Sequence, residues 1–317
     1  MPRIPANDIE IEYEVFGSPS GIPLLLIGGL ADQLIHFDED FCANLAAKGH
    51  FVIRFDNRDT GLSTKVERIS TEPDKGDRTR GSVAERGGQE NGVDSHGYSL
   101  ADMADDAAGL LEVLGIEAAH ICGTSMGGMI AQILALNHPT RVRSLILIYT
   151  HSGSRGLPPP RPDVLELLVK PAPSDRDGYI EYTVSLSKAL AGRGHPFDEQ
   201  WARRIAANAY DRSFSPGGTA RQLRAISAQE SRKEVLSSIT VPTLVIQGTD
   251  DPLVPVEAGV ELADSIPGAE LMLIDGMGHE HLHGRVGYEI AEAIAHHTRS
   301  VAPNSVHPWQ GGSGGHR

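Results

Sequence analysis

The chain has 317 residues, of which 28 are lysine or arginine and 42 are aspartate or glutamate, so its formal net charge is −14. This acidic balance argues against nucleic acid and anionic membranes as partners. With 40% hydrophobic and 22% charged residues, the composition is typical of a folded chain with one large core, or a core and a small subdomain. Cys42 and Cys122 lie inside apolar segments, which predicts buried free thiols rather than a disulfide.

The apolar stretches are too short to cross a membrane. The longest, residues 22–30 and 144–149, fall well short of the roughly 20 residues that a spanning helix needs. The first ten residues carry Asp8 and Glu10 where a signal peptide would need an apolar run. We therefore expect a cytoplasmic protein without a membrane partner.

Short runs rich in valine and isoleucine alternate with segments of helical period. This alternation predicts an α/β fold with a mostly parallel sheet. The first run, Ile9–Phe16, alternates apolar and polar residues, which predicts an antiparallel edge strand with one face in solvent. Six continuous apolar runs predict strands buried on both faces. They are Pro23–Ile27, Phe51–Phe55, Ala119–Cys122, Ser144–Tyr149, Thr243–Gln247 and Glu270–Ile274.

Two helices carry clear start or stop signals. The first is predicted over Ser99–Leu114, with Ser99 as its N-cap and Gly115 as its stop. The second is predicted over Met126–Asn137, because Pro139 cannot continue a helix comfortably. Both helices follow or precede predicted strands, as the α/β pattern requires.

The alternation of strands and helices is interrupted in two stretches of the chain. Residues 151–237 combine proline-rich turns with helical patterns at Trp201–Tyr210 and Ala220–Ala228, which predicts an inserted helical cap. Lys65–Gly97 is nearly free of large apolar residues and is interpreted as a mobile surface insertion. The expected organisation is a first core part at 1–150, the cap at 151–237, a second core part at 238–300 and a disordered tail at 301–317.

The segment Gly123–Gly127 spells GxSxG between a predicted strand and a predicted helix. In this motif a serine lies on a sharp, strained turn, and the two glycines let strand and helix approach closely. A second literal match, Gly311–Gly315, lies in the glycine-rich tail and is interpreted as linker. The context therefore predicts Ser125 as a nucleophile.

A nucleophilic serine needs a histidine base and a carboxylate that orients it. Asp250 and Asp251 follow the predicted strand Thr243–Gln247, and His279 follows the next strand, at the sheet edge where α/β active sites collect. Spacing alone leaves the choice between the two aspartates open. The Met126 amide, at the positive end of the helix after Ser125, is expected to be one oxyanion donor.

Taken together, these segments resemble the α/β-hydrolase superfamily across nearly the whole chain, and the order serine, aspartate, histidine agrees with it. The resemblance is narrower in four runs, which are similar to the aclacinomycin methylesterase-like group of esterases. The runs are VIRFDNRDTGLST (Val52–Thr64), CGTSMGG (Cys122–Gly128), VPTLVIQGTDDPLVP (Val241–Pro255) and IDGMGH (Ile274–His279).

The resemblance implies an α/β-hydrolase fold, with helices flanking a mostly parallel central sheet and a helical cap. It also implies a serine carboxylesterase with Ser125, Asp251 and His279 as catalytic residues, since the acid turn GxxDxxxP matches Asp251 rather than its neighbour. By the same match, the Leu30 N–H joins the Met126 N–H in the oxyanion hole, although glycine stands at position 28, where histidine is commoner in the superfamily.

The expected substrate is a small to medium hydrophobic ester, including methyl esters of polycyclic compounds, and neither a cofactor nor a metal is expected. Two alternatives remain beside this hypothesis. One is a hydrolase of lactones or activated carbon–carbon bonds that uses the same residues. The other is a non-catalytic ligand-binding relative, because fold does not fix function.

A metal-dependent hypothesis comes from the segment His279–His283, which matches the zinc protease motif HExxH. A glycine flanks the motif on each side, so a stable helix through it is disfavoured. Val286 stands where the extended motif needs glycine, and no third ligand follows. We therefore expect His281 and His283 to be solvated histidines.

Overall fold

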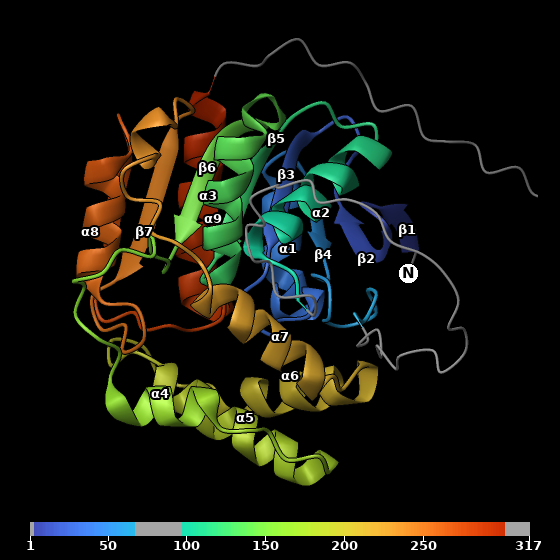
Figure 1. Cartoon of the computed structure of the whole chain (residues 1–317), viewed down its shortest axis with the longest axis vertical. Helices are drawn as coiled ribbons and strands as arrows, with labels where there is room; N and C mark the ends of the chain where they lie inside the picture. Colours follow the sequence, from blue (N-terminus) through green and yellow to red (C-terminus); the bar gives the residue numbers. More distant parts are fainter. Residues whose placement is uncertain (1–2, 67–96, 302–317) are drawn as a thin grey trace, which may run out of the picture.

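The computed structural model describes residues 3–66 and 97–301. Within them, eight strands form one sheet in the order β1-β2-β4-β3-β5-β6-β7-β8 (Figure 1). The pairs β1·β2 and β2·β4 are antiparallel and the other pairs are parallel, which confirms the expected mostly parallel sheet. The strands are β1 (Arg3–Ala6), β2 (Ile9–Phe16), β3 (Ile22–Ile27), β4 (His50–Phe55), β5 (Ala119–Thr124), β6 (Val142–Ile148), β7 (Thr243–Gly248) and β8 (Glu270–Ile274).

Two expectations about the sheet edges are wrong. Strand β2 is not at the edge, because β1 pairs with it through a two-residue turn at Asn7 and Asp8. Both turn residues have positive φ, 48° and 63°, as a tight hairpin connection requires. Strand β8 is not buried on both faces, because it forms the other edge of the sheet and leaves Leu273 48% exposed.

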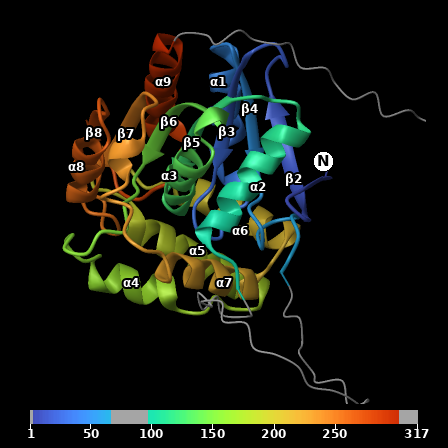
Figure 2. The ribbon, with the colours of Figure 1, turned by 45° about the horizontal axis from the view of Figure 1, so that its top comes forward.

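Helices of the described segments cover both faces of the sheet (Figures 1 and 2). Apolar residues of α2, α3 and α8 pack in one cluster on one face, and those of α1 and α9 pack in a second cluster on the other. At the start of α2, Ser99 and Asp102 form the reciprocal hydrogen bonds of a capping box, as the N-cap prediction required. The helices are α1 (Glu39–Ala47), α2 (Leu100–Val113), α3 (Met126–Asn137), α8 (Val256–Ser265) and α9 (Gly284–Ser300).

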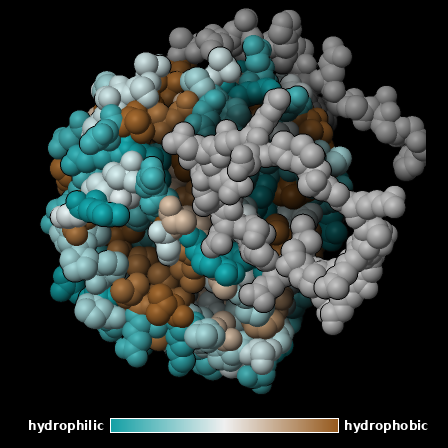
Figure 3. Space-filling model, in the orientation of Figure 1, coloured by the Kyte–Doolittle hydropathy of each residue, from teal (hydrophilic) through white to brown (hydrophobic). Residues whose placement is uncertain are grey.

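Between β6 and β7 the chain forms a separate layer of four helices, at the bottom of Figure 1. Helices α5 and α6 enclose a small apolar cluster of their own around Trp201, Ile180 and Val184. In Figure 3 the face seen in Figure 1 is mostly hydrophilic, with a hydrophobic patch where the sheet meets this layer. The four helices are α4 (Pro162–Val169), α5 (Arg176–Leu190), α6 (Glu199–Arg212) and α7 (Pro216–Ser227).

The two expectations about weakly packed segments lie mostly outside the described residues: the insertion at Lys65–Gly97, apart from its ends, and the tail beyond residue 301. Among the residues that are described, no helix is both long enough and apolar enough to cross a membrane. Cys42 and Cys122 are buried free thiols, as their apolar surroundings predicted.

Ion pairs tie the helical layer to the turn that follows β4. The Arg212 guanidinium of α6 lies 2.7 Å from the Asp56 carboxylate, and Arg221 of α7 lies 2.7 Å from Asp59. Both aspartate side chains are fully buried. Burial raises the pKa of Asp56 above its usual value, although Arg212 and two backbone N–H groups act in the opposite direction.

Replacing Arg212 with methionine tests how strongly this anchor stabilises the fold. The variant Arg212→Met leaves the Asp56 charge buried without its partner, so we expect the free energy of unfolding to fall by about 3 kcal/mol at neutral pH. Urea titration measures the loss.

The loss of unfolding free energy in Arg212→Met, called the deficit below, depends on pH in a defined direction. A carboxyl whose folded pKa is raised stabilises the fold fully below its unfolded pKa, and this contribution is lost as pH rises through the folded pKa. Removing Arg212 raises the folded pKa of Asp56 further, so the deficit grows from about pH 4 to pH 7. The control Arg212→Met with Asp56→Asn removes the dependence, and an equal deficit at both pH values would contradict this account.

Candidate active site

Ser125 lies on the sharp turn between β5 and α3, with φ 52° and ψ −119°. A non-glycine residue in this region carries roughly 1–3 kcal/mol of strain, and hydrogen bonds on both sides hold it there. The Ser125 N–H donates to the Ile148 carbonyl at 3.0 Å, and the Thr150 hydroxyl donates to the Ser125 carbonyl at 2.7 Å. The turn presents the serine hydroxyl at the carboxyl end of β5.

The two glycines of the motif are required by close backbone contacts. A Cβ atom on Gly123 would lie 2.2 Å from the Gly127 carbonyl oxygen. A Cβ atom on Gly127 would lie 2.0 Å from the Ile27 carbonyl oxygen at the end of β3. Any larger residue at either position would therefore push the helix away from the sheet and displace Ser125.

His279 bridges Ser125 and Asp251. Its Nε2 atom lies 2.9 Å from Ser125 Oγ, and its Nδ1 atom lies 2.9 Å from Asp251 Oδ2. The His279 side chain is 8% exposed and that of Asp251 is fully buried. The second carboxylate oxygen, Oδ1, accepts hydrogen bonds from the Leu253 and Val254 N–H groups at 2.9 and 2.8 Å. These bonds fix the carboxylate and leave Oδ2 for the imidazole.

The neighbouring aspartate has a different partner. The Asp250 carboxylate pairs with Arg193 at 2.8 Å, and this contact lowers the pKa of Asp250 below its usual value. Arg193 lies in the loop after α5, so spacing along β7 gave no sign of it. The structure thus brings Asp251, and not Asp250, to His279.

The loop that carries His279 is held by the segment after α5. The His279 N–H donates to the Leu190 carbonyl at 2.8 Å, and the Gly194 N–H donates to the Gly276 carbonyl at 2.9 Å. Contact is so close that a Cβ atom on Gly192 would lie 2.1 Å from the Gly276 oxygen. The helical layer therefore positions the imidazole directly.

The loop after β3 lies against the serine turn. A Cβ atom on Gly29 would lie 3.4 Å from Ser125 Cβ. The Gly29 N–H donates to Asp32 Oδ2 at 3.1 Å and is therefore occupied. Within residues 3–66 and 97–301, the Leu30 and Met126 N–H groups donate to no protein acceptor. Both amides are thus free to bind a negative oxygen.

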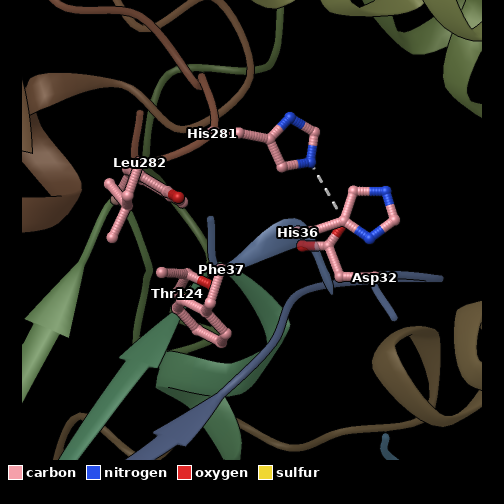
Figure 4. A pocket seen from close by; sticks show the side chains of 7 residues that line it. Asp32, His36, Phe37, Thr124, His281 and Leu282 are labelled. Carbon is pink, nitrogen blue, oxygen red and sulfur yellow. Dashed lines mark hydrogen bonds and ion pairs between the residues drawn. The ribbon is translucent and has the colours of Figure 1, made fainter. Parts of the chain in front are cut away.

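The expectation that His281 and His283 are solvated is wrong. His281 Nε2 lies 3.2 Å from Asp32 Oδ1, and its ring stacks on that of His36 with centroids 4.9 Å apart (Figure 4). His283 stacks on Trp201 of α6 with centroids 4.0 Å apart. Both histidines pack against residues distant in the sequence.

The Asp32 carboxylate is the charged centre of this group. Burial would raise the pKa of Asp32, but the attraction of His281, its hydrogen bond, and the Gly29 N–H together lower it to about 2. Burial lowers the pKa of His36 to about 4, so its imidazole is neutral at pH 7. Asp32 is therefore ionised and anchors the loop that precedes it.

The HExxH hypothesis is contradicted by the geometry. Helix α9 begins at Gly284, after the motif, so His279 and His283 do not share a helical face. His279 faces Ser125, whereas His283 faces Trp201. The two motif histidines therefore form no zinc site together.

Cys122 also has no nucleophilic role. It lies inside β5, fully buried, and burial raises the pKa of its thiol well above the usual value. A thiol that stays protonated is a poor nucleophile. Ser125, by comparison, is half-buried.

Three features of the site were not predicted from the sequence: Asp32, Tyr149 and the segment 190–194. The Tyr149 ring packs on His279 with centroids 4.6 Å apart. Asp32 follows the Gly28–Gly29 loop closely, and that position is the only signal that pointed to it. Tyr149 and the segment after α5 reach the site through tertiary contacts that no local pattern reports.

Comparisons with known proteins show the family to which the chain belongs. A family model described as the alpha/beta hydrolase fold matches residues 22–284. The chain is 31% identical to rhodomycin D methylesterase DauP of Streptomyces sp. (strain C5) over 94% of this chain and 98% of that protein. It is likewise 31% identical to rhodomycin D methylesterase DnrP of Streptomyces peucetius, over 95% of this chain and 99% of the relative.

Solved structures give the same fold. Esterase RhEst1 from Rhodococcus sp. ECU1013 has a TM-score of 0.73 at 22% identity, covering 95% of this chain and 98% of that chain. The meta-cleavage product hydrolase CumD of Pseudomonas fluorescens IP01 gives the same four values. The chain belongs to the α/β-hydrolase family, and within it resembles the aclacinomycin methylesterase-like group.

Proposed function

We propose that this carboxylesterase-type hydrolase cleaves its ester through Ser125, His279 and Asp251 and a covalent acyl-enzyme. The observation that supports the proposal most is the continuous hydrogen-bonded chain from Ser125 Oγ through the imidazole to the Asp251 carboxylate, with both distances at 2.9 Å. Three residues far apart in the sequence meet in the geometry that nucleophilic catalysis by serine requires.

In the proposed mechanism, His279 Nε2 takes the Ser125 proton as Oγ attacks the ester carbonyl carbon. The carbonyl oxygen becomes negative and is bound by the Leu30 and Met126 N–H groups. The alcohol leaves with the proton from Nε2, and water then hydrolyses the acyl-enzyme by the same proton transfers. Asp251 stays ionised and stabilises the imidazolium. The loss of one oxyanion donor typically raises the activation free energy of such a reaction by roughly 3 kcal/mol.

Ester hydrolysis is preferred over the two alternatives, which are hydrolysis of lactones or carbon–carbon bonds and a non-catalytic role. The two methylesterases match this chain over nearly their whole length at 31% identity. A 2-hydroxymuconate semialdehyde hydrolase of Pseudomonas sp. (strain CF600) is also 31% identical, but over only 57% of this chain, and an enol-lactonase of Burkholderia xenovorans LB400 shares the fold at 23% identity. A non-catalytic role would not explain why the strained serine and a fully paired histidine coincide. By analogy with the methylesterases, we propose a methyl ester of a polycyclic compound as substrate.

We further propose that residues 151–237 act as the cap over this site. The position of this layer supports the proposal: its segment 190–194 lies against the loop that carries His279, and its Arg212 and Arg221 pair with the turn after β4.

Removing the nucleophile gives the primary test. We expect Ser125→Ala to lower kcat for p-nitrophenyl esters at least 10³-fold, because no covalent intermediate can form, while circular dichroism and Tm stay unchanged. Stopped-flow release of p-nitrophenol measures the acylation burst. Retention of most activity by the folded variant would remove the nucleophile assignment.

The two adjacent aspartates provide a matched pair. Asp251→Asn deprives His279 of its carboxylate, so we expect kcat to fall by roughly 10³- to 10⁴-fold. Asp250→Asn breaks only the contact with Arg193 and is expected to lower kcat less than about threefold. Steady-state kinetics on one ester compares them, and equal losses would leave the acid unassigned.

Gly192 tests whether the segment after α5 positions the imidazole. A methyl group there collides with the Gly276 oxygen, so we expect Gly192→Ala to lower kcat about tenfold or more with a smaller change in KM. The control is Gly217→Ala in α7, whose Cβ would meet its nearest atom at an ordinary 3.5 Å. Equal kcat values in the two folded variants would contradict the positioning role.

A further inference from the structure

Asp32, His36 and His281 place three metal-ligand side chains around one small space. Within the described ranges, they are the one such set whose ligand atoms all lie within 4.8 Å of one another. Figure 4 shows the His281 ring turned toward the Asp32 carboxylate, with the His36 ring beside it. Two segments 245 residues or more apart in the sequence supply them: the loop after β3 with its short helix, and the loop before α9.

The cavity at this cluster is large enough for one water molecule or one ion. Its volume of about 10 Å³ is roughly that needed for one water molecule or one ion. Four further residues complete its wall. They are Phe37, Thr124, Tyr149 and Leu282.

The distances fit a tetrahedral ion. Two ligand atoms that are each about 2.1 Å from a tetrahedral zinc ion lie roughly 3.4 Å apart. The separation between His281 Nε2 and Asp32 Oδ1 is 3.2 Å, so these two atoms already form one edge of such a site. The third ligand atom, on His36, lies within 4.8 Å of the other two, so the two loops must approach each other by roughly 1 Å for all three atoms to contact one ion.

His36 and Asp32 each make a further hydrogen bond to the backbone, as the ligands of metal sites usually do. His36 Nδ1 lies 2.9 Å from the Gln33 backbone nitrogen and 3.0 Å from its carbonyl oxygen, and the tautomer that donates Nδ1–H to this carbonyl is the one that leaves the Nε2 lone pair for a metal. Asp32 Oδ2 is held by the Gly29 N–H, which leaves Oδ1 for the ion. Two imidazoles and one carboxylate are ligands that suit zinc and similar first-row divalent cations.

We propose that Asp32, His36 and His281 bind one divalent cation of the zinc class, with water as the fourth ligand. The cation lies between His281 Nε2 and Asp32 Oδ1, and His281 binds it as a neutral imidazole whose hydrogen is on Nδ1. Through Asp32 and the Gly29 N–H, the bound cation restrains the loop that carries Leu30. The site is separate from the serine chemistry, which needs no metal.

Binding is tested on the full chain carrying Ser125→Ala, stripped with chelator, so that the result is independent of hydrolysis. We expect isothermal titration with Zn²⁺ to show one saturable site, a raised Tm, and visible absorption of four-coordinate Co²⁺ when Co²⁺ replaces it. His36→Gln and His281→Gln, made separately, are expected to weaken binding about tenfold or more and to abolish the Co²⁺ band.

The matched control is His138→Gln. His138 Nε2 lies 2.7 Å from Asp105 Oδ1, so this histidine also pairs with an aspartate but is not part of the cluster. We expect it to bind Zn²⁺ like the parent chain. Circular dichroism verifies the fold of each variant. Equal affinity in the parent and in both cluster variants, or saturable binding lost in all three histidine variants alike, would overturn the proposal.

Discussion

The site depends on two hydrogen bonds of one imidazole. His279 contacts the Ser125 hydroxyl on one side and the Asp251 carboxylate on the other, each at 2.9 Å. Both partners are fixed by backbone: a strained turn with hydrogen bonds on each side holds the serine, and two N–H groups of its own turn hold the aspartate. The parallel sheet makes this possible, because β5, β7 and β8 end at the same edge.

The helical layer is part of the site rather than an addition to it. Its segment after α5 donates no reacting group in the proposed mechanism, yet the Leu190 carbonyl accepts the His279 N–H, and Gly192 and Gly194 lie against the histidine loop. The same layer is attached at its other end through Arg212 and Arg221. The position of the imidazole therefore depends on contacts with this layer.

Local sequence patterns predicted most of the core, because its strands, helix cap and serine turn depend on residues that are neighbours in the sequence. The continuous apolar runs, the Ser99 cap and the turn at Ser125 each follow from neighbouring residues, and the structure contains them. The sheet edges could not be predicted in this way, since the edge position of β8 depends on the order of all the strands. Strand β1 is only four residues long and contains a proline, so it carried little strand signal.

The surroundings of the site were harder to predict for the same physical reason. Spacing left Asp250 and Asp251 open, because the contact that separates them is made with His279, 28 residues further along the chain. His281 was expected in solvent once the zinc motif was disfavoured, because no local pattern indicated its partner Asp32, which lies 249 residues away. Hydrogen bonds between distant segments leave no periodic trace in a sequence.

The central claim is that the imidazole of His279 makes Ser125 a nucleophile, and covalent labelling tests it most directly. The protein is incubated with a fluorophosphonate and its peptides are mapped by mass spectrometry. The account predicts one adduct, on Ser125, that forms at least 10²-fold more slowly in folded His279→Gln. Labelling of another residue, or labelling of Ser125 at an unchanged rate without the histidine, would contradict it.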